Sequence, residues 1–93
     1  MKLNLYINKL IRRIEKKIGK KDTLDALGVT RKTISCWKYN KYDLSVDQLK
    51  QVCILASKVL EEDLRMLFMD GLIQLTEDTM KQANERKEND GLL

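Results

Sequence analysis

The sequence predicts a small all-α protein, and three observations favour this fold class. Among the 93 residues there is no proline and there are only four glycines, while Leu and Lys are the commonest residues, a composition typical of helical domains. Apolar residues recur at intervals of three and four, which is the helical period. Residues of helix-capping type stand where these runs begin. We therefore expect five helices around one modest core.

The first two helices follow from apolar spacing and from two glycines. Leu3, Ile7, Leu10, Ile11, Ile14 and Ile18 share one face, so a helix should run from about Asn4 to about Lys17 and stop at Gly19. A short second helix should cover Thr23 to Leu27, with Asp22 as its N-cap and Gly28 as its C-terminal break.

The third helix should begin after Thr30, whose hydroxyl can cap it. Ile34 and Trp37 are three residues apart, so both should face the core. Asn40 should end this helix, because Asn tolerates the left-handed conformation better than any residue except Gly.

The fourth and fifth helices are predicted from a capping box and a second apolar run. Ser45, followed by Gln48 three residues later, matches the capping-box pattern. The expected apolar face of the fourth helix comprises Leu49, Val52, Cys53 and Ala56. A fifth helix is expected from Glu61 to Met69, with Leu64, Leu67 and Phe68 inward.

The segment beyond Met69 has a less regular pattern. Residues 72–75 could form a short strand or extend a helix, and the polar tail from Glu85 should fray. The apolar residues of this segment are Met69, Leu72, Ile73, Leu75 and Met80. They need cover either from the same chain or from a second chain.

Charge divides the chain into two unlike halves. Residues 1–42 hold twelve basic and three acidic side chains, a net charge of +9, whereas residues 43–93 hold six basic and eleven acidic ones, a net charge of −5. The basic half suggests a polyanionic partner. The alternative is a set of amphipathic helices whose lysines and arginines simply face water.

The stretch GVTRKTISCWKYNK, residues 28–41, carries four basic side chains and no acidic one. A short helix, a break at Gly28 and a capped helix anchored by Ile34 and Trp37 together describe a helix-turn-helix. The outward face of the second of these helices then carries Arg31, Lys32, Thr33, Ser35, Cys36, Lys38 and Tyr39. Arg and Lys can donate to guanine, and Ser and Thr can reach bases or phosphates, so this pattern favours DNA binding.

The stretch LGVTRKTISCW resembles the core of the Cro/CI-type (XRE-like) helix-turn-helix family, and LSVDQLKQVC resembles a segment downstream of that core. The resemblance covers roughly residues 7–68. It implies a five-helix, lambda-repressor-like DNA-binding domain over residues 1–69, with residues 70–93 as a C-terminal extension. It also implies a homodimer bound to an operator in double-stranded DNA.

The resemblance assigns roles to residues at and around the third helix. The implied base-contacting residues are Thr30, Arg31, Lys32, Ser35 and Cys36. The implied phosphate-contacting residues are Lys20, Lys21, Thr33, Lys38, Tyr39, Asn40 and Lys41. The sequence departs from the family at Leu24, where a small Ala is usual. The larger side chain would either hold the two motif helices further apart or shift the register of the motif.

Other chemistry finds little support in the sequence. There is no histidine, and Cys36 and Cys53 lack zinc-like spacing. The cluster Glu61, Glu62 and Asp63 is explained by the preference of acids for helix starts. We therefore expect no catalytic residue, no metal and no cofactor, and we expect a protein that is not an enzyme. No apolar stretch is long enough to span a membrane, and two cysteines without a signal peptide favour a cytoplasmic location.

These features favour a small sequence-specific transcriptional regulator, a repressor of phage or mobile-element type, that acts by occupying its operator. Two alternatives remain open. One is an antitoxin-type regulator whose residues 70–93 bind a partner protein. The other is a protein-interaction module that keeps the fold without binding DNA.

Overall fold

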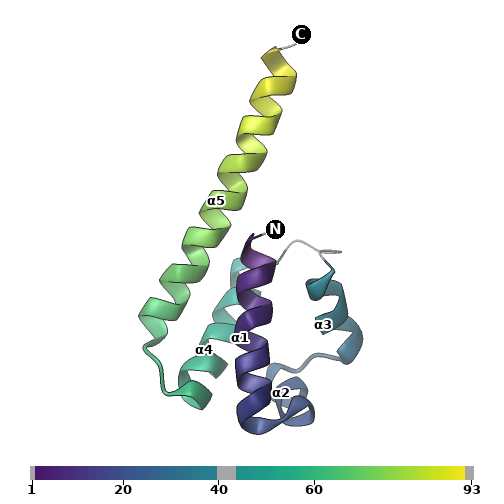
Figure 1. Cartoon of the computed structure of the whole chain (residues 1–93), viewed down its shortest axis with the longest axis vertical. Helices are drawn as coiled ribbons and strands as arrows, with labels where there is room; N and C mark the ends of the chain where they lie inside the picture. The colour runs from purple at the N-terminus through teal and green to yellow at the C-terminus, as the bar shows by residue number, and fades with distance from the viewer. Residues whose placement is uncertain (1, 40–43, 92–93) are drawn as a thin grey trace.

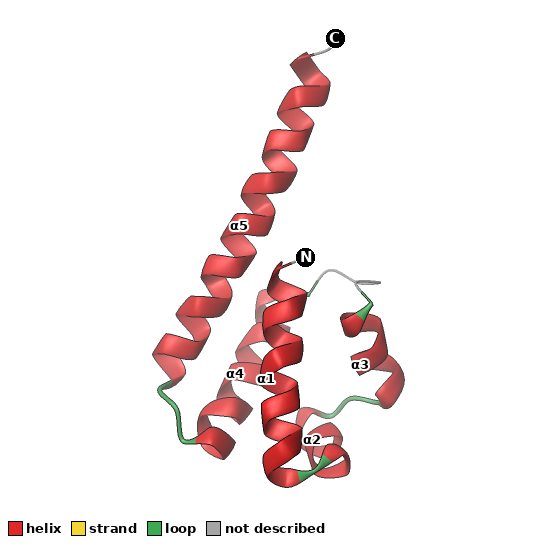
Figure 2. Ribbon diagram, viewed as in Figure 1, coloured by secondary structure: helices red, strands yellow, loops and turns green. Residues whose placement is uncertain are grey.

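The computed structural model describes residues 2–39 and 44–91, with side chains up to residue 84. It contains five helices, α1 (Lys2–Ile18), α2 (Lys20–Leu27), α3 (Arg31–Lys38), α4 (Val46–Leu60) and α5 (Leu64–Gly91), and the described ranges contain no strand (Figures 1 and 2). The predicted all-α class is confirmed.

Helix α1 is the centre of the fold and contacts each of the other four helices. In Figure 1, α3 and α5 flank it on opposite sides, α2 lies at its C-terminal end, and α4 lies behind it. Its apolar stripe, predicted from spacing, is buried over Leu3, Ile7, Leu10, Ile11 and Ile14. Leu49, Val52, Cys53 and Ala56 of α4 are fully buried and complete the core, as their spacing predicted.

A single residue joins α1 to α2. Gly19 has φ 90° and ψ 161°, a conformation that side chains with a Cβ rarely adopt, so the chain turns there and α2 starts at once at Lys20. The expected start at Thr23 with Asp22 as N-cap is therefore wrong. Gly19 is the N-cap, and Asp22 lies in the first turn, where its charge favours the helix dipole.

The two ends of α4 differ in how well the sequence predicted them. The capping box is confirmed, since the Ser45 hydroxyl accepts from the Gln48 amide and the Gln48 side chain accepts from the Ser45 amide. Glu61 adopts a left-handed conformation, φ 55°, and ends α4 there. As a result α5 begins at Leu64 rather than at Glu61. Leu64 is 41% exposed, so its expected inward position is wrong, whereas Leu67 is buried.

Helix α5 is much longer than the sequence predicted. It runs for 28 residues without a break at the expected domain boundary between residues 69 and 70, and residues 72–75 extend the helix rather than form a strand. Gly71 permits this path, because a Cβ at this position would overlap the side chain of Leu49. The distal turns of α5 project beyond the globule (Figure 1). The radius of gyration is accordingly 15.0 Å, against about 12 Å for a compact domain of this length.

Polar contacts fix α5 along α1. The Asp78 carboxylate accepts from the backbone amides of Lys2 and Leu3, both at 3.0 Å, and so caps the start of α1 from a distant helix. Nearer the start of α5, the Tyr6 hydroxyl donates to the Leu67 carbonyl at 2.6 Å. Burial raises the pKa of Tyr6 to about 12.

Candidate nucleic-acid interface

The turn between α2 and α3 is built by Gly28. Its left-handed backbone, φ 68° and ψ 31°, lets the Gly28 amide donate to the Asp25 carbonyl and the Val29 amide donate to the Leu24 carbonyl. This pair of bonds is the Schellman arrangement that closes a helix C-terminus. The break predicted at Gly28 is confirmed.

Two residues later Thr30 starts the next helix. Its hydroxyl accepts from the Thr33 amide at 3.3 Å and lies 3.2 Å from the Thr33 hydroxyl, so the predicted cap is confirmed. Helix α3 then runs to Lys38, with Tyr39 as its C-cap. The expected end at Asn40 lies outside the described residues.

The inward side of α3 rests on one large side chain and one hydrogen bond. Trp37 is 3% exposed, as predicted, and Ile34 is partly buried against the core. The Asn4 amide nitrogen donates to the Trp37 carbonyl at 2.9 Å from a fully buried position on α1. This polar tie holds the C-terminal turn of α3 against the start of α1.

The predicted contact residues of α2 and α3 differ in exposure. Those exposed to solvent are Lys20, Lys21, Thr30, Arg31, Lys32, Ser35, Lys38 and Tyr39. Thr33 and Cys36 are half-buried, while Asn40 and Lys41 lie outside the described residues. The Lys38 ammonium lies 5.8 Å from the centre of the Tyr39 ring, within the range of a cation–π contact.

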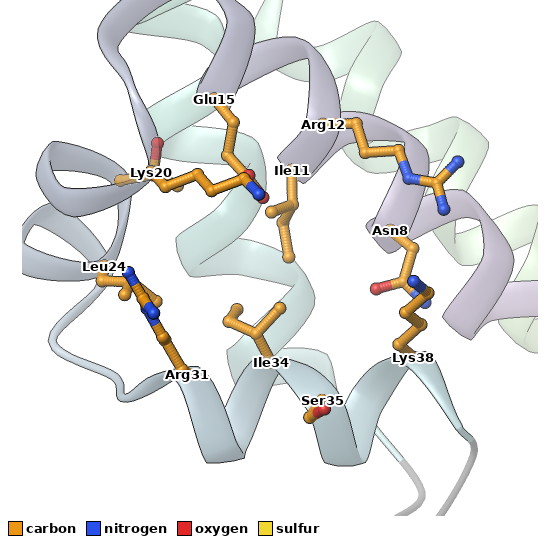
Figure 3. Close-up of a pocket in the computed structure, with 11 residues that line it drawn as sticks. Asn8, Ile11, Arg12, Glu15, Lys20, Leu24, Arg31, Ile34, Ser35 and Lys38 are labelled. Atoms are coloured by element: carbon orange, nitrogen blue, oxygen red, sulfur yellow. The ribbon is translucent and has the colours of Figure 1, made fainter.

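The residues of α3 divide between two flanks. Arg31, Ser35 and Lys38 line a cavity of about 470 Å³ that α3 shares with α1 and α2, and Lys20 lines it from the α2 side (Figure 3). Lys32 and Cys36 do not line this cavity and lie one turn apart on another face of α3. The structure therefore separates Lys32 and Cys36 from the group formed by Lys20, Arg31 and Lys38.

The cations of α2 and α3 lack carboxylate partners within the part of the chain that the structure describes. Its ion pairs there join Lys2 to Glu77 at 2.7 Å and Arg13 to Glu62, and both tie α1 to the region after α4. No acidic residue occurs between Asp25 and Asp43. The positive charge of α3 thus remains available to an external anion.

Sequence reasoning missed the contribution of α1 to this region. Asn8, Arg12 and Glu15 are spaced by four and three residues, and together they line the wall of the cavity opposite α3. The four cations Arg12, Arg13, Lys16 and Lys17 could not be told apart from spacing alone. Arg13 pairs with Glu62, and the hydrogen bond raises its pKa, whereas Arg12 faces the cavity.

Within residues 2–39 and 44–91, no helix is long and apolar enough to cross a membrane. The same residues contain no group of three or more His, Cys, Asp or Glu side chains that could hold a metal ion. Cys36 and Cys53 are both free thiols, and burial raises the pKa of Cys53 to about 11. No family model, curated protein or solved structure matches this chain.

Proposed function

We propose that this protein is a sequence-specific regulator of transcription that binds double-stranded DNA through α3 and works as a homodimer. The observation that carries the proposal is the exposed surface of α3, which is cationic, free of acids and anchored from behind by Trp37. The resemblance of LGVTRKTISCW to the Cro/CI-type helix-turn-helix family supports the same function. The mode of action that we propose is repression by occupancy of an operator.

The two flanks of α3 suggest different tasks on DNA. Lys32 and Cys36 lie on the face away from the cavity, which suits contact with base edges in the major groove. Lys20 and Lys38 lie on the other flank, where they suit the phosphates that fix the register of α3. Arg31, at the first turn of α3, is proposed to read bases together with Lys32.

Salt titrations of single variants test this assignment on the preferred DNA, selected from a random pool, and on random DNA. Arg31→Ala and Lys32→Ala should each weaken preferred-site binding by about 1–3 kcal/mol while barely changing binding to random DNA. Lys20→Ala should weaken both alike and reduce the salt slope by about one phosphate contact. Lys17→Ala, at an exposed site on α1 outside the cavity, is the matched control. Equal loss on both DNAs for Arg31→Ala and for Lys32→Ala would refute base reading by α3.

Dimerisation is supported by an uncovered apolar stripe on α5. Met66, Met69, Ile73 and Met80 are 68%, 61%, 51% and 60% exposed, and exposed Thr76 and Ala83 complete an alternation of three and four residues. That alternation is the heptad seam of a two-stranded coiled coil. The other large apolar residues of α5 pack against the core of their own chain; these are Leu67, Leu72 and Leu75. The exposed stripe has no such cover, so we propose that a partner covers it.

Charge beside the stripe favours a second copy of this chain in parallel orientation. In the heptad register set by Met66 and Met69, exposed Arg65 falls at a g position and exposed Asp70 at the following e position. In a parallel pair each g residue lies next to the following e residue of its partner. The Arg65 of each copy would therefore pair with the Asp70 of the other copy, which gives two ion pairs per dimer. An antiparallel pair would bring the acidic e positions, Asp70 and Glu77, together. A parallel homodimer therefore fits both the apolar and the charged pattern.

Sedimentation of point variants tests the dimer while keeping Gly71 and Asp78, which hold α5 on the globule. Ile73→Glu should give a monomer, and Arg65→Glu should weaken association. Adding Asp70→Arg to Arg65→Glu should restore association, because the swap recreates the pair. Lys81→Glu, off the seam, is the control. A wild-type chain that stays monomeric at micromolar concentration would overturn the homodimer and favour a partner protein on this stripe.

A further inference from the structure

The cavity between α1, α2 and α3 is large enough to hold a small organic molecule. Its volume is about 470 Å³, within the range of about 300–1,000 Å³ that ligand pockets occupy. Three different helices line it, so its shape depends on how α3 is placed against α1 and α2. Figure 3 shows Ile34 pointing from α3 toward Ile11 of α1, with Leu24 approaching from α2.

The apolar part of the lining consists of Ile11, Leu24 and Ile34. Ile11 is buried, whereas Leu24 and Ile34 are only half-buried, and all three line the cavity. An apolar group placed there would complete the burial of Leu24 and Ile34. Such burial stabilises a complex in proportion to the apolar area removed from water.

The polar part of the lining is strongly positive. The charged residues of the lining are the cations Arg12, Lys20, Arg31 and Lys38 and the single acid Glu15. None of these four cations forms an ion pair with a described residue. Figure 3 shows Arg31 extending from α3 toward Leu24, and Lys38 extending toward Asn8 of α1. A lining that combines several cations with an apolar patch is complementary to a molecule with an apolar body and an anionic head.

We propose that this cavity binds an amphipathic organic anion, with a carboxylate or phosphate head and a short apolar chain or ring, and that the occupant competes with DNA. The competition rests on the proposed function, because Lys20, Arg31 and Lys38 are also proposed DNA contacts. A bound anion would neutralise these cations, and its apolar body would fix the placement of α3 against α2. The anion would then act as an inducer that lowers occupancy of the operator.

Four small probes separate the contributions of the head and the chain, with the protein alone and no DNA present. Acetate carries the charge alone, octan-1-ol carries the chain alone, and octanoate and octyl phosphate carry both. Methyl-resolved NMR should show octanoate shifting the resonances of Ile11, Leu24 and Ile34, with affinity at least about tenfold above octan-1-ol, as a charge-assisted contact would give. Acetate should shift none of them. The ratio of the affinities for octanoate and octyl phosphate shows whether the cavity prefers a carboxylate or a phosphate head.

Variants decide whether the cavity is the site of binding. Arg31→Gln combined with Lys38→Gln should lower the affinity for octanoate by at least about tenfold and leave the affinity for octan-1-ol unchanged. Lys17→Gln should leave both affinities unchanged. Circular dichroism confirms that each variant is folded. Equal affinity for octanoate and octan-1-ol, or shifts confined to the exposed methionines of α5, would overturn the proposal.

DNA competition separates this proposal from the proposed function. Octanoate should raise the apparent Kd of wild-type protein for its preferred DNA, with half of the effect at the octanoate Kd measured by NMR. Octanoate binding without any DNA binding would refute the proposed function and leave the anion site standing. Specific DNA binding without octanoate binding would refute the anion site and leave the proposed function standing. Octanoate binding that leaves DNA affinity unchanged would refute the competition.

Discussion

Helices α3 and α5 both pack on α1, but they are held there in opposite ways. Helix α3 has eight residues, of which only Trp37 is buried, and one polar tie from Asn4. Helix α5 is packed over several turns, by Leu67, by the close approach at Gly71 and by the Asp78 cap. The contact of α3 with the core is thus concentrated in one side chain, whereas that of α5 is distributed.

This difference bears on what each helix is free to do. With a single anchor, α3 leaves most of its surface and one flank of a cavity open to an external partner. Helix α5 is fixed along α1, yet it presents a second apolar stripe on the side opposite its own core contacts. The first arrangement leaves a cationic surface exposed, and the second leaves an apolar stripe exposed.

The largest effect should come from the anchor of α3. Trp37→Ala removes its one buried side chain and should lower the free energy of unfolding by about 3–5 kcal/mol. Thermal and urea unfolding followed by circular dichroism measure this loss. Tyr39→Ala, two residues on and 65% exposed, should change the free energy of unfolding by no more than about 0.5 kcal/mol. Similar values for the two variants would show that α3 is not held by Trp37.

A smaller effect is expected where α5 crosses α4. Gly71→Ala gains about 1 kcal/mol of helix propensity but forces a methyl group into Leu49, at a cost of about 1–3 kcal/mol. We expect a net loss of up to about 2 kcal/mol in urea unfolding. Asn84→Ala, on an exposed position of α5, lacks the clash and should be neutral or stabilising. A stabilised Gly71→Ala variant would mean that α5 lies further from α4.

The Asp78 cap should contribute less again. Asp78→Ala leaves the amides of Lys2 and Leu3 without their acceptor and should cost about 1 kcal/mol, the usual value for a lost N-cap. Asp78→Asn, which keeps one acceptor oxygen, should recover part of this loss. Thr79→Ala, the exposed neighbour, is the control in the same unfolding series. If Asp78→Ala is neutral, the start of α1 is capped by water rather than by α5.

The elements that sequence predicted well are those with one apolar face. Helix α4 buries every residue that its spacing assigned to the core, and α1 does so except for Ile18, which is half-buried. Ser45 and Gly28 act as expected. Helix α5 was predicted to end near Met69 because its apolar residues occupy two opposite faces. Apolar residues on two faces of one helix do not show a single helical period. Gly71 suggested a helix break from sequence, whereas in the structure it allows α5 to pack closely on Leu49. A left-handed Glu61 has no sequence signature.

The candidate site was predicted in part. Periodicity placed Trp37 inward and the cations of α3 outward, because one helix determines both. It could not show that Arg31 and Lys38 converge with Lys20 and Arg12 on one cavity, since that depends on how three helices are spaced. The one sequence feature that bore on this spacing was the large side chain of Leu24, which lines the cavity from α2. From sequence, Asn4 was interpreted only as the start of the first helix. Nothing in its spacing indicated that its side chain would donate a hydrogen bond to the Trp37 carbonyl.

The smallest expected effect concerns Tyr6, which ties α1 to the first turns of α5. Tyr6→Phe removes the bond to the Leu67 carbonyl and should cost about 0.5–1 kcal/mol at pH 8. In the folded protein the Tyr6 pKa of about 12 exceeds its ordinary value of 10.0. Its contribution to stability is therefore complete below pH 10 and is lost as pH rises toward 12.

The pH dependence of the stability difference between wild type and Tyr6→Phe is the sharper test of the Tyr6 hydrogen bond. Cys53, whose pKa is raised from 9.0 to about 11, should lower the stability of both proteins at alkaline pH, and so should Lys2, whose pKa is raised by its hydrogen bond to Glu77. Only the wild type also loses the Tyr6 contribution, because the unfolded chain releases that proton first. The gap between wild type and Tyr6→Phe in urea unfolding should therefore narrow between pH 9 and pH 11.5. A gap that stays constant across this range would mean that folding does not raise the pKa of Tyr6, and that its hydroxyl is as well solvated in the folded protein as in the unfolded chain.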